Sequence, residues 1–176
     1  RLDNLEPDPG TYRLAGPNDD GDYTFTALPA GVYRLSFSPQ EDYRYAREWW
    51  DDAFNPGDSR TIVLDGENTA VADAVIGEWG VVRGTITGLA GRPLSSVSIQ
   101  PYLVEASGEV AQPKLLSDSG SYRIRSLRPG TYRVVFRRSG YRSREITFTI
   151  GLDEAITRDI QLEPSAEGEF SSVTAE

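Results

Sequence analysis

Short stretches of the chain alternate strictly between hydrophobic and polar residues. Tyr23 and Phe25 alternate with threonines, and Tyr33, Leu35 and Phe37 repeat the pattern a few residues later. A period of two residues is typical of a strand with one buried face. The sequence between the two runs contains proline, which fixes φ, and glycine, which tolerates a positive φ, as tight turns require. The pattern therefore predicts two half-buried strands joined by a turn.

This strand–turn–strand segment occurs twice. Residues 120–136 repeat residues 21–37, and the copies share seven residues at fixed spacing. In the first copy these are Gly21, Tyr23, Leu28, Gly31, Tyr33, Arg34 and Phe37, and in the second they are Gly120, Tyr122, Leu127, Gly130, Tyr132, Arg133 and Phe136. The chain therefore duplicates one module, and the first copy carries an aromatic insertion at about residues 44–60.

Further short segments rich in β-branched residues follow each copy, such as "TIVL", "AVADAVI" and "TFTI". No stretch sustains the 3.6-residue period of a helix. We therefore predict an all-β fold of two tandem antiparallel β-sandwiches. The expected modules are residues 1–77 and 78–164, followed by a polar tail at 165–176.

The segments "GVVRGTITGLAGRPLSSVSIQPYLV" and "SDSGSYRIRSLRPGTYRVVFRRSGY" carry a family resemblance. They resemble the carboxypeptidase-regulatory-like and collagen-adhesin B-type modules, and the resemblance extends over most of residues 12–163. It implies a transthyretin-like (prealbumin-like) sandwich and an accessory, stalk or adhesion role in an extracellular bacterial protein. The matching residues belong to turns and core, so the resemblance is specific for fold and not for activity.

The first copy is shorter than the second ahead of its motif. Residues 81–119 precede the motif in the second copy, whereas only 20 residues precede it in the first. We therefore expect the first sandwich to lack its opening strands, either through truncation or because another segment supplies them. An open sheet edge can accept a strand from another chain, so self-association is one expected interaction. The polar tail is a candidate for that strand, and disorder is the alternative.

Composition excludes several kinds of chemistry. The chain has no histidine and no cysteine, and Lys114 is its only lysine. Disulfides, thiolate nucleophiles, histidine bases and the usual zinc ligands are therefore absent. A net charge of −9 argues against nucleic-acid binding, and no apolar run approaches the roughly 18 residues of a membrane span. We expect no catalytic residues and no cofactor, unless calcium binds.

The insertion concentrates aromatic and acidic residues, which makes it the first candidate ligand site. Flat rings can stack on sugars while carboxylates bind hydroxyl groups, so we expect a glycan as one possible ligand. The alternative is that the rings cap the sandwich or pack against Trp79 between the copies. The candidate residues are Tyr43, Tyr45, Trp49, Trp50, Asp51, Asp52 and Phe54.

The second copy has eight arginines and no acid within residues 121–144. By alternation, Arg123, Arg125, Arg133 and Arg137 are expected to share the outward face of two neighbouring strands. Facing like charges are unfavourable unless carboxylates intervene. Either carboxylates of the same copy balance them, or they bind an acidic partner such as the first copy of another molecule, where residues 1–79 hold 16 acids and 6 arginines.

A turn in the first copy, "PNDDGDY", places Asn18, Asp20 and Asp22 at alternate positions, as at the start of a calcium-binding loop. Pro29 stands where an EF-hand has its bidentate glutamate, so only a looser calcium site is possible. The alternative is an ordinary solvated turn.

These observations favour a non-catalytic structural or adhesive module of a bacterial cell-surface or secreted protein. Its expected partners are other domains of that protein, a glycan or a host or matrix protein, without direct membrane insertion. A carbohydrate-binding accessory module and a self-assembling fibre subunit completed by a donated strand are the alternatives.

Overall fold

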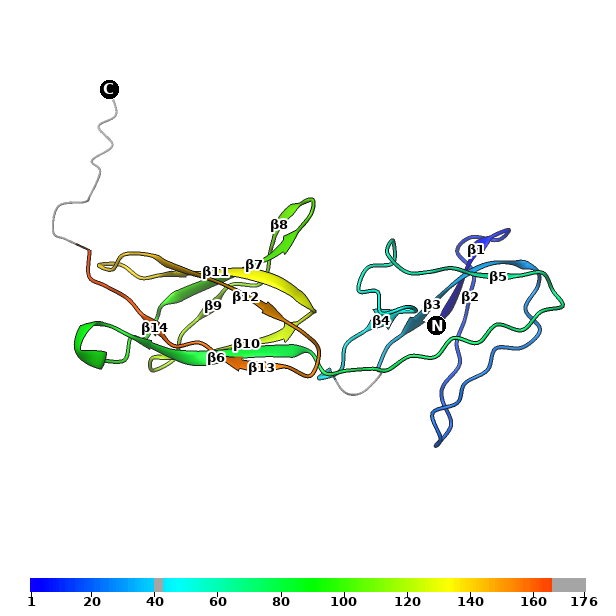
Figure 1. The fold of residues 1–176 in the computed structure, drawn as a ribbon, viewed down its shortest axis with the longest axis horizontal. Coiled ribbons are helices and arrows are strands. Elements are labelled where there is room, and N and C mark those ends of the chain that lie inside the picture. The colour runs from blue at the N-terminus through cyan, green and yellow to red at the C-terminus, as the bar shows by residue number, and fades with distance from the viewer. Residues whose placement is uncertain (40–42, 166–176) are drawn as a thin grey trace, which may run out of the picture. The chain divides into compact units, whose positions relative to one another are not determined.

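The computed structural model describes residues 1–39 and 43–165. Over these residues the fold is built of β-strands, and the helical content is a single short turn at Leu89–Gly91. The all-β prediction is confirmed. The chain divides into two compact units, unit 1 (Arg1–Glu78) and unit 2 (Trp79–Glu176), each drawn in Figure 1.

Unit 2 is a sandwich of two sheets. In the first sheet β6 is central, antiparallel to β10 and parallel to β13 and β14. The second sheet has the order β12-β11-β7-β8, with β9 also paired to β7. The strands are β6 (Gly80–Thr87), β7 (Ser98–Glu105), β8 (Gly108–Ala111), β9 (Leu115–Leu116), β10 (Ser121–Leu127), β11 (Gly130–Arg137), β12 (Arg144–Ile150), β13 (Ala155–Thr157) and β14 (Ile160–Gln161).

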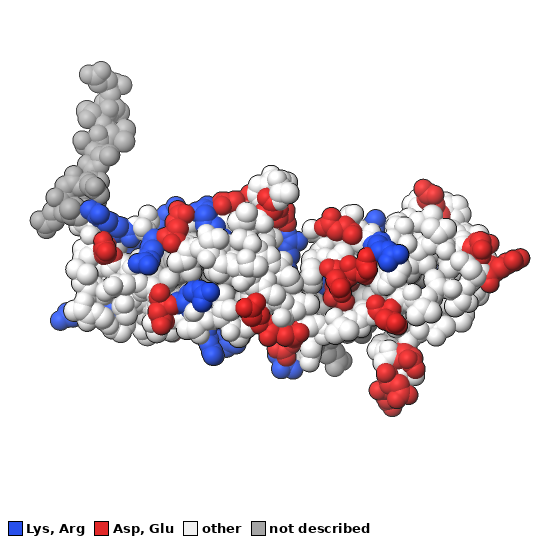
Figure 2. Space-filling view, viewed as in Figure 1, with Lys and Arg blue, Asp and Glu red and all other residues white. Residues whose placement is uncertain are grey.

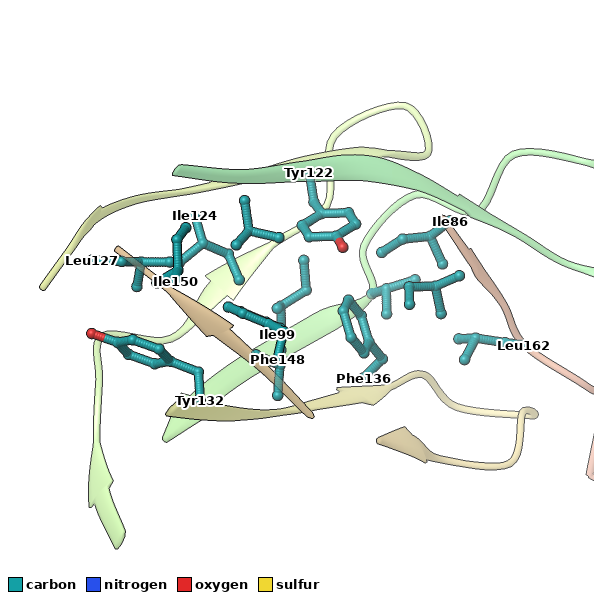
Figure 3. Packing of buried hydrophobic residues seen from close by; sticks show 14 of the residues in the cluster. Ile86, Ile99, Tyr122, Ile124, Leu127, Tyr132, Phe136, Phe148, Ile150 and Leu162 are labelled. Atoms are coloured by element: carbon teal, nitrogen blue, oxygen red, sulfur yellow. The ribbon is translucent and has the colours of Figure 1, made fainter. Parts of the chain in front are cut away.

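The core of unit 2 lies between these sheets, where alternate side chains of facing strands meet (Figure 3). The ring of Tyr122 on β10 meets that of Phe136 on β11 edge-on, with centroids 5.3 Å apart. Tyr132 stacks on Phe148 at 5.9 Å. Such ring pairs add about 0.5–1.5 kcal/mol to the stabilisation from apolar burial. The alternating pattern in the sequence therefore builds a closed, aromatic-rich core.

Unit 1 contains one sheet among its described residues, with the order β2-β1-β3-β4 and β5 also paired to β3. Its strands are β1 (Leu2–Glu6), β2 (Tyr12–Arg13), β3 (Gly31–Phe37), β4 (Glu48–Trp49) and β5 (Ile62–Leu64). The repeat places β3 at the position of β11. The pairing of β1 with β3 matches that of β7 with β11, because Leu2 lies opposite Leu35 and Pro101 lies opposite Val134.

The sequence analysis expected no opening strand in the first copy, and β1 corrects this expectation. The described part of unit 1 contains no counterpart of β6. The structure also differs at residues 22–28 and 70–76, which were expected to be strands and form none (Figure 1). In unit 2 the corresponding segments are strands because both pair with β6. Without that central strand, neither segment of unit 1 has a partner strand among the described residues.

Gly31 and Gly130 open the matching strands for different reasons. Gly130 adopts a φ of +154°. A Cβ atom at Gly31 would instead overlap the carbonyl oxygen of Glu6 on β1. The sequence pattern predicted a positive φ at both positions, and the structure assigns close approach of the backbone to the first.

Candidate binding groove

The face of the unit 1 sheet that packs against residues 22–28 is incompletely buried. In unit 2, Tyr122, Ile124 and Leu127 are 6%, 4% and 3% exposed. Their counterparts Tyr23, Phe25 and Leu28 are only half-buried and pack against the small core formed by Leu2, Tyr33 and Leu35. The apolar face that the repeat builds twice is therefore covered in one unit and partly open in the other.

The half-buried segment nevertheless keeps the backbone shape of its counterpart. Ala27 has a φ of +54° and Ser126, the matching residue of β10, has a φ of +58°. In unit 2 this residue lies in a bulge between Ile124 and Leu127 of the ladder to β6. Residues 22–28 thus carry the bulge of a paired strand without a partner strand in the described chain.

Side-chain contacts are repeated as well. Tyr23 meets Phe37 edge-on at 5.6 Å, as Tyr122 meets Phe136. The Tyr23 hydroxyl donates a hydrogen bond to the Ala72 carbonyl, as the Tyr122 hydroxyl donates to that of Arg158. Burial, followed by the nearby Asp73 carboxylate, raises the pKa of Tyr23. The pKa of Tyr122 is raised mainly by burial and also by Asp159.

In unit 2 the strand β6 passes between the two ends of this tyrosine bridge. A Cβ atom at Gly84 would overlap the Arg158 carbonyl oxygen and lie 3.0 Å from Cε1 of Tyr122. Asp159 accepts hydrogen bonds at 2.8 Å from both the backbone NH and the hydroxyl of Thr85. The bridge therefore spans one β-strand, whose glycine makes room for the tyrosine ring.

A groove of about 820 Å³ occupies the matching region of unit 1. Its walls are residues 21–28 and 66–73, and Leu2, Leu35 and Ile62 contribute to its apolar floor. A second groove of about 700 Å³ shares Tyr23, Phe25 and Asp73 with it. We refer to the first as the strand groove. The sequence analysis expected an open sheet edge in the first copy but did not locate this groove, because its position follows from how β6 pairs in unit 2.

The aromatic residues of the insertion are dispersed. Tyr43 is 87% exposed, while Trp49 lies on β4 and Trp50 packs against the core of unit 1. Arg47 lies over the ring of Trp49 at 4.9 Å from its centroid, and Arg60 lies over Trp50 at 5.0 Å. One face of each indole is therefore in contact with a guanidinium group, as in cation–π pairs. Tyr45 and Phe54 are half-buried.

Acidic residues of the insertion also differ in their surroundings. Asp51 and Asp52 are exposed in a turn where both have positive φ, at +73° and +56°. Glu48, two residues before Trp50, is 1% exposed. Burial raises its pKa, and the carboxylate of Asp52 adds to this shift. The sequence shows no sign of this burial, because Glu48 lies beside two exposed aspartates.

The four selected arginines do not share one face, which corrects that expectation. Arg123 and Arg125 lie on β10 and Arg133 and Arg137 on β11, and these strands belong to different sheets. The turn between them crosses from one layer of the sandwich to the other instead of forming a hairpin within a sheet. On the face shown in Figure 2, basic side chains of unit 2 alternate with acidic ones.

Carboxylates from the neighbouring strands surround Arg133. Its guanidinium donates to Glu109 of β8 at 2.7 and 2.6 Å and to Glu145 of β12 at 3.1 Å. It also lies over the ring of Tyr102, 4.5 Å from the centroid. Arg133 holds the pKa of Glu109 below its ordinary value. This arginine is therefore balanced within unit 2, as one of the two interpretations expected.

The turn at Asn18 is closed by its own side chain. The Asn18 carboxamide oxygen accepts hydrogen bonds from the backbone NH groups of Asp20 and Asp22, at 3.1 and 2.8 Å. Such a turn is common for asparagine and occupies the oxygen that a calcium ion would need. Over residues 1–39 and 43–165 the structure contains no cluster of three or more acidic side chains arranged to hold a metal. The described residues also form no helix long and apolar enough to cross a membrane.

Comparison with known proteins shows a family similarity of unit 2. Residues 81–163, from β6 to just beyond β14, match the family model of the carboxypeptidase regulatory-like domain. Unit 2 is therefore similar to carboxypeptidase regulatory-like domains over these residues. The match begins with the strand β6, and the regulatory-like domain thus contains the strand whose counterpart the described part of unit 1 does not show. No curated protein matches the chain.

Several solved structures are similar to the chain at low identity. A minor pilin from Streptococcus agalactiae is 23% identical over 86% of this chain and 68% of that one, with a TM-score of 0.45. Transthyretin from Sparus aurata is 18% identical over 47% and 88%, with a TM-score of 0.40. The 3-chlorocatechol 1,2-dioxygenase of Rhodococcus opacus 1CP is 15% identical, with a TM-score of 0.38, and the matched region spans 60% of its length. None of these likenesses bears on binding or activity.

Proposed function

We propose that the chain is a non-catalytic structural or adhesive module of a bacterial cell-surface or secreted protein. The observation that carries the proposal is the use of the repeated residues. Tyr33 and Tyr132 each donate a hydrogen bond to the carbonyl four residues earlier, at 2.8 and 3.1 Å. Tyr23 and Tyr122 bridge backbones, and the shared glycines shape turns and close contacts. The duplicated residues therefore form structural contacts, and the duplication adds scaffold and surface instead of reactive groups.

The resemblance of the sequence to modules of bacterial surface proteins supports the location. Antibodies raised against the purified chain test it directly in the source organism. Labelling of intact cells, and its loss after mild protease treatment of the cell surface, is the expected result. Labelling that requires cell lysis would contradict the proposal.

An adhesive role through glycans can be separated from a purely structural one. The double variant Trp49→Ala/Trp50→Ala removes the two indoles of β4 and its turn, and Tyr102→Ala removes an aromatic ring of unit 2 as a matched control. If the insertion binds sugars, the wild-type chain and the control bind on a glycan array and the double variant does not. If the module is structural, no variant changes the signal.

A further inference from the structure

We propose that the strand groove of unit 1 binds an extended polypeptide segment as an added β-strand. The segment has apolar residues on both sides of the pair Gly-Thr and takes the position that β6 has in unit 2. This inference concerns the architecture of unit 1 and does not rest on the proposed cellular location. It is carried by the internal comparison of the two units.

The walls of the groove have the spacing of strands on either side of a missing one. Tyr122 and Arg158 lie on the two sides of β6, and the hydrogen bond between them crosses that strand at Gly84. Tyr23 and Ala72 form the same hydrogen bond in unit 1. Because neighbouring strands lie about 4.8 Å apart, segments that flank one strand are separated by about 9.6 Å, a distance that a tyrosine side chain and its hydrogen bond bridge together.

Neither wall of the groove is paired with a strand among the described residues. Among the described residues, Tyr23–Leu28 and residues 69–76 belong to no strand and pair with none. In unit 2 the equivalent segments pair with β6, antiparallel on one side and parallel on the other. An incoming strand would gain hydrogen bonds on both sides, which is a stronger arrangement than addition to a single edge.

The side chains of the groove select the sequence of the strand. In unit 2 a side chain at Gly84 would overlap the Arg158 carbonyl and crowd the Tyr122 ring. The Ala72 carbonyl and the Tyr23 ring form the same bridge in unit 1, so the crossing point fits a glycine. Asp73 is exposed beside Tyr23, where Asp159 accepts the backbone and hydroxyl hydrogen bonds of Thr85. Half-buried Phe25 and Leu28 offer apolar contacts to residues at alternate positions. The groove therefore fits an apolar-x-Gly-Thr-apolar segment, of which Val82–Ile86 is an example.

A peptide that copies Trp79–Gly88 is the probe. Its binding to the full chain is measured by fluorescence polarisation, and we expect saturable binding with one peptide per chain. A peptide with Gly84→Val is expected to bind at least tenfold more weakly, because the added side chain meets the Ala72 carbonyl and the Tyr23 ring, as it would meet the Arg158 carbonyl and the Tyr122 ring in unit 2. In the chain, Asp73→Ala is expected to weaken binding severalfold, whereas Asp20→Ala, an exposed acid of the nearby turn, leaves it unchanged.

Amide hydrogen exchange of the full chain provides a second readout that does not depend on any variant. Exchange of residues 22–28 and 69–76 is expected to slow when the peptide is added, while that of residues 121–127 stays as it was. Equal affinity for both peptides, or no binding at millimolar peptide, would overturn the proposal. So would a dimer in light scattering that the peptide does not dissociate, since a second copy would then be the occupant.

Discussion

At the scale of single residues, the two units use the same side chains for the same contacts. Tyr23 and Tyr122 each meet a phenylalanine and bond to a carbonyl beyond the neighbouring strand position. The two units differ in the residue that the tyrosine side chain covers. In unit 2 it covers Gly84 of β6, so the stability of unit 2 should depend on the absence of a side chain there.

Replacing Gly84 with alanine tests this dependence. The new Cβ would overlap the Arg158 carbonyl oxygen, which is backbone and cannot move aside easily. We expect a loss of about 2 kcal/mol or more in the free energy of unfolding of unit 2, measured by urea denaturation. Gly88→Ala is the control, because its Cβ would have ordinary contacts at 3.5 Å. Equal stability of the two variants would show that the crossing is not tight.

The buried tyrosines predict how stability depends on alkaline pH. Burial raises the pKa of Tyr122 and Tyr132 above the ordinary value of 10.0. The folded state then retains protons that the unfolded chain releases, so their contribution is complete below about pH 10 and is lost as the pH rises through the folded pKa. Tyr122→Phe should cost about 1 kcal/mol at pH 7 for the lost hydrogen bond and should flatten the alkaline decline. Denaturation curves from pH 7 to 11 measure both effects, and an unchanged alkaline slope would contradict the assignment.

A buried polar atom in unit 1 predicts a stabilising substitution. Asn4 of β1 is 8% exposed, and its Oδ1 has no hydrogen-bond partner among the described residues. The matching position of β7 is Leu103, which is buried in the core of unit 2. Because an unsatisfied buried polar group costs about 1–3 kcal/mol, Asn4→Leu should raise the unfolding temperature of unit 1. A lowered unfolding temperature would show that Asn4 is satisfied in solution.

At the scale of elements, alternation predicted strands well where a partner strand exists. The pattern at Tyr122–Phe136 became β10 and β11, while the same pattern at Tyr23–Phe25 formed no strand, because pairing depends on a residue range elsewhere in the sequence. A local pattern also does not show to which of the two sheets a strand belongs. The turn at Arg128–Gly130 looked like a hairpin but joins two sheets, so the predicted arginine face was divided. The residues that neighbour Glu48 along the chain show no sign that it is buried. The strand groove could be located only by comparing the structures of the two units.

The ladder of β8, β7, β11 and β12 explains why Arg133 lies among carboxylates, and it predicts a weak effect that depends on salt. Arg133 depresses the pKa of Glu109, so the stabilisation from this pair is present above the ordinary carboxyl pKa and is lost as the pH falls through the depressed value. Glu109→Gln should lower the unfolding temperature of unit 2 slightly at neutral pH and low salt, and the difference should vanish in 1 M salt. Glu163→Gln, on an exposed residue outside this cluster, is the control. A difference that persists in 1 M salt would point to packing instead of charge.

At the scale of the whole molecule, the repeated module contains the central strand β6 in unit 2 and no counterpart of it in the described part of unit 1. Unit 2 buries sixteen residues in one core cluster, whereas the cluster of unit 1 has three among the residues described. Apolar burial is the main favourable contribution to folding, so unit 1 should open more readily than unit 2. A strand bound in the groove should reduce this difference.

Amide hydrogen exchange of the full chain, read segment by segment without added peptide, tests the central claim most directly. In unit 2 the strand β6 lies between the two ends of the tyrosine bridge, and the described part of unit 1 has no strand there. Matching segments of the two units should therefore exchange at different rates. Residues 22–28 and 69–76 should exchange rapidly, and residues 121–127 and 155–161 should be protected at least a hundredfold more. Equal slow exchange in both pairs of segments would show that unit 1 is a closed sandwich and would contradict the account.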